Sequence, residues 1–249
     1  MTPTESPAMP ARVAIVTGGS AGIGASICTH LLDAGWGVVS MSRRPTEIDH
    51  PALHSVEVDL GDVAATRAAA LEVCARFPVT GIVHNAGAMR PALLADVTVE
   101  DLEALTALHL SAPLVLVQAA LPEMRRRRFG RIVLVSSRAA LGLATRTAYS
   151  ATKSGMFGLA RTWALELGRD GITANVVAPG PVVTDMFHEV IPREQAALEA
   201  TAAKIPVGRV GLPDDVARAV LFFASPDNGF VTGQSLYVCG GTSVGSITY

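Results

Sequence analysis

Short runs of β-branched residues alternate along this sequence with longer stretches that carry apolar residues at helical spacing. The runs that have the length and composition of strands are residues 13–17, 38–41, 55–58, 81–84, 131–136, 172–177 and 235–238. Between them, residues 66–76 are rich in alanine and leucine, and residues 149–167 place apolar side chains on one helical face. Such alternation predicts βαβ units. We therefore expect an α/β protein with a doubly wound parallel sheet of seven strands.

The alternation continues from residue 12 to about residue 240 without a linker rich in Pro, Gly or Ser, which predicts a single domain over residues 12–249. Residues 1–11 lack this pattern and the basic-then-apolar order of a secretory signal, so a flexible N-terminal tail is expected. Residues 181–208 follow a strand directly and contain a helical stretch between prolines. Because ligands of open α/β sheets bind beyond the carboxyl ends of the strands, this segment is a candidate substrate lid.

Composition argues against several classes of partner. Hydrophobic residues make up 49% of the chain and charged residues 17%, as in a globular domain with a sizeable core. The formal net charge of -2 offers no general attraction to nucleic acid or acidic membranes, and the apolar runs are shorter than the ~20 residues that span a bilayer. Cys28, Cys74 and Cys239 lack the spacing of a disulfide framework or metal site. We expect a cytoplasmic protein with a small-molecule partner, no metal, and no nucleic-acid or membrane partner.

A glycine-rich turn lies between the first predicted strand and the first predicted helix. Its sequence is TGGSAGIG, residues 17–24. Residues without a Cβ let the backbone turn tightly and approach a pyrophosphate, which the N–H groups at the helix start can bind. The context therefore predicts a dinucleotide site. Its expected cofactor-binding residues in the turn are Gly18, Ser20, Gly22, Ile23 and Gly24.

The residues after the second predicted strand indicate which dinucleotide binds. An acid at this place usually holds the ribose hydroxyls of NAD, whereas a basic group accommodates the extra phosphate of NADP. Here the chain reads Ser42-Arg43-Arg44, with no carboxylate, and a guanidinium can grip a phosphate in fork geometry. We expect NADP(H) to be favoured, with Arg43 as a cofactor-binding residue. NAD(H) is the alternative if the arginines are solvated loop charges.

Three further side chains point to acid–base chemistry. Tyr149 and Lys153 are four residues apart on a predicted helix and share one face, where an ammonium group favours the phenolate. The tyrosine pKa of ~10 is then expected to fall toward neutral pH, so that the side chain can exchange a proton with a carbonyl or alcohol. Ser137 follows the fifth predicted strand and could hydrogen-bond the substrate oxygen. Ser136 is a second candidate for that role.

In their order along the chain, these segments resemble the short-chain dehydrogenase/reductase family in its compact, single-domain, Rossmann-like form. The resemblance extends from residue 12 to about residue 241 and includes the 3-oxoacyl-acyl-carrier-protein reductases. TGGSAGIG is similar to the TGxxxGIG turn, HNAG to the NNAG segment with His84 replacing the first Asn, YSATK to YxxxK, and PGPVVT to the PGxxxT stretch beside the nicotinamide. The resemblance implies that Lys153 also reaches the nicotinamide ribose. It further implies as cofactor-binding residues Asp59, Leu60, Asn85, Ala86, Gly87, Tyr149, Pro179, Gly180, Val182 and Thr184.

We therefore expect an NAD(P)-dependent oxidoreductase that transfers a hydride between a nicotinamide and a carbonyl or alcohol substrate, with Tyr149 as general acid/base. A non-catalytic dinucleotide sensor of the same fold is the alternative. The set of Ser137, Tyr149 and Lys153 favours the enzyme, because a sensor has no need of an activated phenol. The resemblance also implies a homotetramer. Apolar faces for its assembly could come from Leu114, Val117, Leu121, Met156 and Trp163.

Some positions depart from the family pattern or have more than one interpretation. His109, a candidate catalytic residue, stands where the family usually has the asparagine of a proton relay; it is either a relay group or a packed helix residue. Arg128 occupies the place of an arginine that docks an acyl carrier protein, but Asp170 stands where the second docking arginine is expected. Three arginines would favour an anionic substrate if they lie at the substrate mouth rather than on the surface: Arg90, Arg138 and Arg146.

Overall fold

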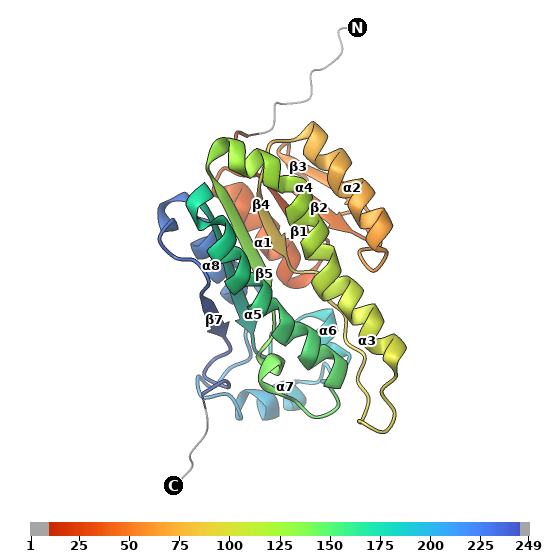
Figure 1. Ribbon diagram of the computed structural model, residues 1–249. Helices are drawn as coiled ribbons and strands as arrows, with labels where there is room; N and C mark the ends of the chain where they lie inside the picture. Colours follow the sequence, from red (N-terminus) through yellow and green to blue (C-terminus); the bar gives the residue numbers. More distant parts are fainter. Residues whose placement is uncertain (1–9, 245–249) are drawn as a thin grey trace, which may run out of the picture.

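The computed structural model describes residues 10–244, in which seven strands form one sheet between two layers of helices (Figure 1). Residues 1–9 of the expected N-terminal tail lie outside the described residues. The strands are β1 Val13–Thr17, β2 Gly37–Ser42, β3 Leu53–Glu57, β4 Val79–His84, β5 Gly130–Val135, β6 Ile172–Pro179 and β7 Ser235–Val238. The helices are α1 Gly22–Asp33, α2 Val63–Arg76, α3 Val99–Thr106, α4 Ala112–Arg127, α5 Thr147–Leu167, α6 Asp185–His188, α7 Gln195–Ala202 and α8 Pro213–Ala224. Shorter helical turns are η1 Ala107–Ser111, η2 Arg138–Leu141, η3 Gly168–Asp170 and η4 Pro226–Asn228.

The strand order in the sheet is β3-β2-β1-β4-β5-β6-β7, and every neighbouring pair is parallel. The chain winds in opposite directions from β1 and from β4, so the loops after these two strands diverge and leave a crevice at the carboxyl edge. This arrangement confirms the expected doubly wound, seven-stranded Rossmann-like domain. The predicted strand ends differ from the observed ones by at most two residues.

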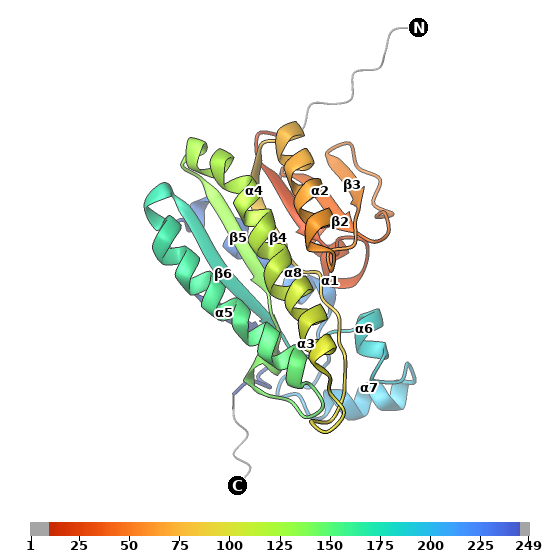
Figure 2. The ribbon, with the colours of Figure 1, turned by 45° about the vertical axis from the view of Figure 1, so that its right-hand side comes forward.

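Helices α2, α4 and α5 cover one face of the sheet, and α1 and α8 cover the other (Figures 1 and 2). Successive side chains of a strand point to opposite faces, so both layers receive apolar residues from the same strand. In β1, Ile15 belongs to the core with Met156 of α5, whereas Val16 belongs to the core with Ile27 of α1 and Val220 of α8. The strands are therefore apolar throughout rather than alternating.

The residues expected to supply apolar faces for a tetramer are mostly turned inward. Val117, Met156 and Trp163 are buried in the core that α4 and α5 form with the sheet. Leu121 is half-buried, and Leu114 is exposed. The expectation is wrong for the three buried residues, because the apolar stripe of each helix covers the sheet.

Residues Val99–Arg127 form one helical run that is long and apolar enough, by length and composition, to cross a membrane. This run is longer than the strand-sized apolar runs expected from the sequence. Much of it packs inside the protein, where Leu105, Leu116 and Met124 are buried. Its hydropathy is therefore that of a core helix.

The arginine run 125–128 at the end of α4 is held by contacts within the chain. Its first arginine pairs with Asp170 at 2.9 Å, and Arg128 donates to the carbonyl oxygen of Arg169 at 2.8 Å. Arg126 and Arg127, which lie between these two residues, both pair with Glu123. These contacts, at the end of the helix where cations oppose its dipole, favour the interpretation of the run as a helix cap.

The segment of residues 183–210, which contains α6 and α7, leaves the carboxyl end of β6 and returns to the same place (Figure 2). Hydrogen bonds join the residues at its two ends. The N–H of Val183 donates to the Gly211 carbonyl oxygen at 3.0 Å, and the N–H of Gly211 donates to the Pro181 carbonyl oxygen at 2.9 Å. The helical stretch expected between the prolines is present as α7. The segment therefore projects beyond the sheet as a closed loop.

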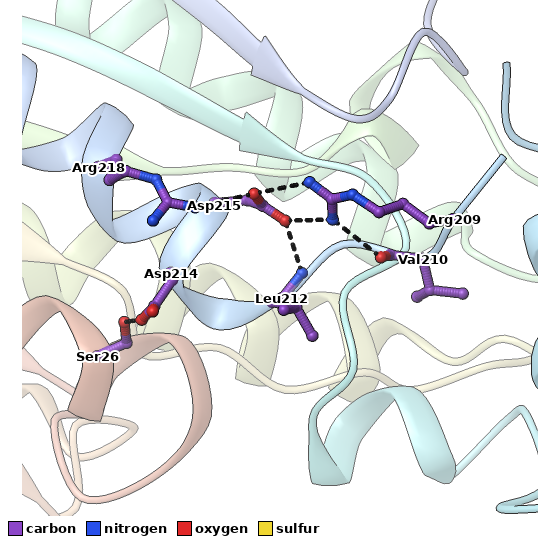
Figure 3. Close-up of polar contacts among 7 residues, drawn as sticks. All are labelled: Ser26, Arg209, Val210, Leu212, Asp214, Asp215 and Arg218. Carbon is purple, nitrogen blue, oxygen red and sulfur yellow. Dashed lines mark hydrogen bonds and ion pairs between the residues drawn. The ribbon is translucent and has the colours of Figure 1, made fainter. Parts of the chain in front are cut away.

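Polar contacts at the start of α8 hold the return of this loop (Figure 3). Asp215 pairs with Arg209 at 2.7 and 2.9 Å and accepts a hydrogen bond from the N–H of Leu212, just before the helix begins. The neighbouring Asp214 accepts a hydrogen bond from Ser26 of α1. The loop thus returns to a helix that is itself fixed to the body of the domain.

Candidate active site

A cavity of about 930 Å³ opens at the carboxyl edge of the sheet. Its size is typical of ligand-binding clefts. The cavity is lined by the glycine turn, the ends of several strands and the 183–210 segment. All predicted site residues line it except Gly24 and His109. Those that do are Gly18, Ser20, Gly22, Ile23, Arg43, Asp59, Leu60, Asn85, Ala86, Gly87, Ser137, Tyr149, Lys153, Pro179, Gly180, Val182 and Thr184.

The start of α1 lies at this cavity without a capping side chain. Ala21 occupies the N-cap position, and the first turn contains no acidic residue, so its N–H groups are available to an anion. Gly18 and Gly22 have φ values of +66° and +53°, a region that favours glycine. A Cβ on Gly24 would lie 2.0 Å from the Gly18 carbonyl oxygen. The turn therefore depends on its glycines, and its shape fits a pyrophosphate.

Hydrogen bonds fix the end of β4 against the glycine turn. The Thr17 hydroxyl oxygen accepts the backbone N–H groups of Asn85 and Ala86, both at 3.0 Å, and lies 3.0 Å from Nδ1 of His84. The Asn85 side chain donates to the carbonyl oxygens of Thr17 and Gly18. The HNAG segment is thus held directly beside the turn, at the crevice between β1 and β4.

The part of the cavity next to the end of β2 carries positive charge. Arg43 and Arg44 follow β2, are exposed, and form no ion pair among the residues that the structure describes. Asp59 lies nearby, with its carboxylate accepting the N–H of Gly61 at 2.9 Å. Two free guanidinium groups at this place fit a phosphate on the adenosine ribose.

Ser137, Tyr149 and Lys153 come together where β5 and α5 meet the cavity. Lys153 is 2% exposed; its Nζ donates to the Val135 carbonyl oxygen at 2.8 Å and lies 5.8 Å from the Tyr149 ring centroid. The Ser137 oxygen accepts the N–H of Ala139 at 3.1 Å, and its hydroxyl also interacts with the Tyr149 side chain. The geometry thus brings the three predicted catalytic groups to one wall of the cavity.

The second serine candidate, Ser136, is engaged elsewhere. Its side chain is buried, and its hydroxyl donates to the backbone carbonyl oxygen of Lys153 at 2.8 Å. Because that contact ties β5 to α5, the hydroxyl is not directed at a substrate. The structure therefore favours Ser137 for holding the substrate oxygen.

The pKa of the tyrosine differs from the sequence-based prediction. We expected the neighbouring ammonium to lower the pKa of Tyr149, but burial raises it, with the Ser137 hydroxyl and Arg146 acting in the opposite direction. Burial also lowers the pKa of Lys153 to about 7. Desolvation disfavours the charged form of each group, and for Tyr149 it outweighs the opposing effects of Ser137 and Arg146. At neutral pH the Tyr149 side chain is therefore a protonated phenol.

His109 lies behind the catalytic wall, in the π-helical turn η1. Its Nδ1 is 2.8 Å from the Thr152 hydroxyl, and its Nε2 accepts the N–H of Ala88 at 3.3 Å. Burial, Lys153 and His84 lower its pKa. The imidazole is therefore neutral, and each of its ring nitrogens already has a partner within the protein. This favours the interpretation of His109 as a packed helix residue over that of a relay group.

Thr152, whose hydroxyl holds the His109 ring beside the site, was not among the residues predicted from the sequence. It lies within YSATK, between the tyrosine and the lysine, and its hydroxyl also donates to the Ala148 carbonyl oxygen at 2.9 Å. Its position three residues after Tyr149, on the same helical face, was the signal that could have identified it.

A metal does not fit these residues. Among residues 10–244, no group of three His, Cys, Asp or Glu side chains is placed to hold a metal ion. The cavity instead combines backbone N–H groups, guanidinium groups and a phenol, which suit a phosphate-bearing organic cofactor and a polar substrate.

Comparison with known proteins identifies relatives that match nearly the whole chain. Residues 18–243 match a family model described as enoyl-(acyl carrier protein) reductase. The chain is 36% identical over 244 residues to subunit BbsD of a hydroxy(phenyl)methylsuccinyl-CoA dehydrogenase from Thauera aromatica, covering 94% of this chain and 97% of that protein. It is 37% identical to an acetoacetyl-CoA reductase from Rhizobium meliloti over 240 residues, 92% of this chain and 98% of the other.

The chain belongs to the short-chain dehydrogenase/reductase family. A solved member of similar structure is a gluconate 5-dehydrogenase from Burkholderia cenocepacia in complex with NADP and tartrate. It superimposes with a TM-score of 0.85 at 29% identity, covering 96% of this chain and 97% of the other. As in the other members of the family named here, the function is that of an oxidoreductase, and a non-catalytic sensor is not favoured.

Proposed function

We propose that this short-chain dehydrogenase/reductase uses NADP(H) to interconvert a carbonyl and an alcohol, with Tyr149 as the general acid/base. The observation that carries the proposal is the placement of Ser137, Tyr149 and Lys153 on the wall of the cavity that also contains the glycine turn. Acid–base groups and an anion-binding helix start then serve one site. A site that only bound a dinucleotide would not need a buried phenol beside a buried lysine.

The cofactor fits the remaining surfaces of the cavity. The glycine turn and the start of α1 would hold the pyrophosphate, Arg43 would hold the adenosine phosphate, and Lys153 would approach the nicotinamide ribose. The bound nicotinamide supplies or accepts the hydride. NADP bound to the gluconate 5-dehydrogenase named above supports the choice of NADP(H) over NAD(H).

The protein's own groups handle the proton. In the direction of reduction, the Ser137 hydroxyl and the Tyr149 phenol donate hydrogen bonds to the carbonyl oxygen, and Tyr149 then transfers its proton to that oxygen. Burial raises the pKa of Tyr149, so the phenol carries a proton at neutral pH, as this direction requires. In the reverse direction the phenolate must form first, and a positive charge on Lys153 assists it.

Three further properties belong to this proposal. Residues 181–208 form the substrate lid, supported by the apolar side chains of Phe187 and Ile191 on the cavity wall.

The assembly is a homotetramer that uses exposed apolar residues of α4 and α5, Leu114 and Leu165. The location is cytoplasmic, supported by cysteines that are all free.

The replacement Tyr149→Phe tests the catalytic assignment. It removes the proton donor and keeps the ring, so NADPH binding measured by fluorescence should be preserved while turnover of ketones and alcohols falls by about 100-fold or more. Turnover is followed by nicotinamide absorbance. Tyr237→Phe in β7, outside this cavity, is the matched control and should retain wild-type rates. Retained turnover in Tyr149→Phe would refute the assignment.

A further inference from the structure

Arg146 is a buried cation without an anionic partner. Its side chain lines the active-site cavity, is 7% exposed, and forms no ion pair with any acidic residue in the described part of the chain. Arg90, in contrast, has a side chain that is 50% exposed and pairs with Asp101 at 2.9 Å. Arg138 is half-buried and reaches the Thr242 carbonyl oxygen at 3.5 Å. Of the three candidate arginines, Arg146 is the one whose charge is buried and uncompensated.

The backbone holds Arg146 at a defined place. It is the N-cap residue of α5, three positions before Tyr149. The preceding Thr145 has a φ of +64°, a conformation uncommon outside glycine, and its carbonyl oxygen accepts the N–H of Ala92 at 3.0 Å. Such strain is retained where the surrounding structure fixes the backbone, often at a ligand site.

The side chain is fixed at one of its three nitrogens. Nη1 donates to the Thr145 carbonyl oxygen at 3.2 Å and to its hydroxyl at 2.6 Å. Within residues 10–244, neither Nε nor Nη2 donates to any group. These two nitrogens form the side edge of the guanidinium, which can bind a carboxylate through two parallel hydrogen bonds.

No acid of the cavity compensates this charge. Asp185 already pairs with Arg193 at 3.0 Å, and the Asp59 carboxylate accepts the N–H of Gly61. Glu189 also lines the cavity, but it forms no ion pair with Arg146 in the structure. A buried charge without a counter-ion is unfavourable. A carboxylate of a ligand in the cavity would supply the missing negative charge.

We propose that Arg146 binds a carboxylate of the substrate, so that the enzyme acts on oxo- or hydroxycarboxylates. The inference rests on the proposed function and narrows its substrate class. Arg146 and Tyr149 are separated by about one helical turn, so a small acid can place its carboxylate on the guanidinium while its carbonyl oxygen meets the phenol. The neutral ester of the same acid would lose the charge-assisted contact.

The test measures binding without turnover. The protein is loaded with NADP+, which cannot reduce a ketone, and is titrated calorimetrically with 3-oxobutanoate, 4-oxopentanoate and 5-oxohexanoate and with the methyl ester of each. At least one acid should bind the wild type about 10- to 100-fold more tightly than its ester, as expected for hydrogen bonds to a charged group. In Arg146→Gln this preference should disappear. Arg146→Lys should restore part of it, because it keeps the charge but lacks the fork.

The control is Arg90→Gln, which removes an exposed arginine that Asp101 already engages, and it should keep the preference. Equal binding of every acid and its ester by the wild type, or an acid preference that persists in Arg146→Gln, would overturn the proposal. Thermal unfolding and NADP+ affinity verify that each variant is folded and loaded. Failure of the proposed function would differ from these outcomes, because it would leave NADP+ unbound or Tyr149→Phe active.

Discussion

At the scale of single residues, the site is governed by burial. Lys153 is enclosed by the protein and donates to the Val135 carbonyl oxygen, it forms no ion pair with a carboxylate of residues 10–244, and desolvation lowers its pKa to about 7. The same effect raises the pKa of Tyr149. Removal from water therefore keeps the proton on the phenol at neutral pH, and it also makes the phenol a weaker acid than a solvated tyrosine.

The lowered pKa of Lys153 predicts how stability depends on pH. The unfolded chain holds this proton up to a pKa near 10.5, whereas the folded protein releases it above about 7. Between these pH values the unfolded state binds more protons, so raising the pH favours the folded state. Urea unfolding of the cofactor-free protein at pH 6.5 and pH 9 should show this gain. In Lys153→Met the gain should be smaller, and parallel pH profiles for the two proteins would contradict the prediction.

At the scale of secondary-structure elements, the sequence predicts positions better than electrostatics. The pattern of apolar residues located all seven strands. The glycine turn, HNAG and PGPVVT lie at the cavity because parallel strands end at one edge of the sheet, and YSATK reaches it from helix α5. The sign of the Tyr149 shift, the partners of His109 and the burial of Arg146 could not be predicted. They depend on contacts between segments far apart in the chain, which spacing along one helix does not reveal.

The start of α1 gives a prediction for two glycines. In Gly24→Ala the new methyl group would collide with the Gly18 carbonyl oxygen, so the free energy of unfolding should fall by about 1–3 kcal/mol and NADPH binding should be lost. Gly168→Ala is the matched control: it has a helical φ of -58° and no atom within 4 Å of the added carbon. It should stabilise the protein by about 0.4–1 kcal/mol. Chemical denaturation measures both, and equal effects would contradict the argument.

At the scale of the whole molecule, the proposed tetramer depends on side chains that the fold leaves uncovered. Leu165 of α5 is 86% exposed. Leu71 of α2 is 56% exposed on a helix of the same layer that the proposal leaves outside the interface. Exposed leucines of this size are common on monomers, so the location of the residue rather than its exposure decides whether it joins subunits.

Analytical ultracentrifugation of two charged variants tests this difference. Leu165→Glu should shift the protein from tetramer to smaller species, because a carboxylate buried between subunits lacks a partner. Leu71→Glu should leave the tetramer intact, and both variants should unfold at nearly the wild-type temperature. A monomeric wild type, or the same assembly in both variants, would refute the proposed interface.

The hydrogen bonds that join Pro181 and Val183 to Gly211 close the intervening chain into a loop, which also contacts the residues after β7 through the N–H of Val207 and the Gly240 carbonyl oxygen. Its two ends already meet at a fixed pair of backbone groups, so lengthening or replacing what lies between them changes the closure entropy only slowly and leaves the sheet registry untouched. The shape of the proposed substrate entrance can therefore diverge, by evolution or by design, while the strands and helices that hold the proposed catalytic groups stay in place.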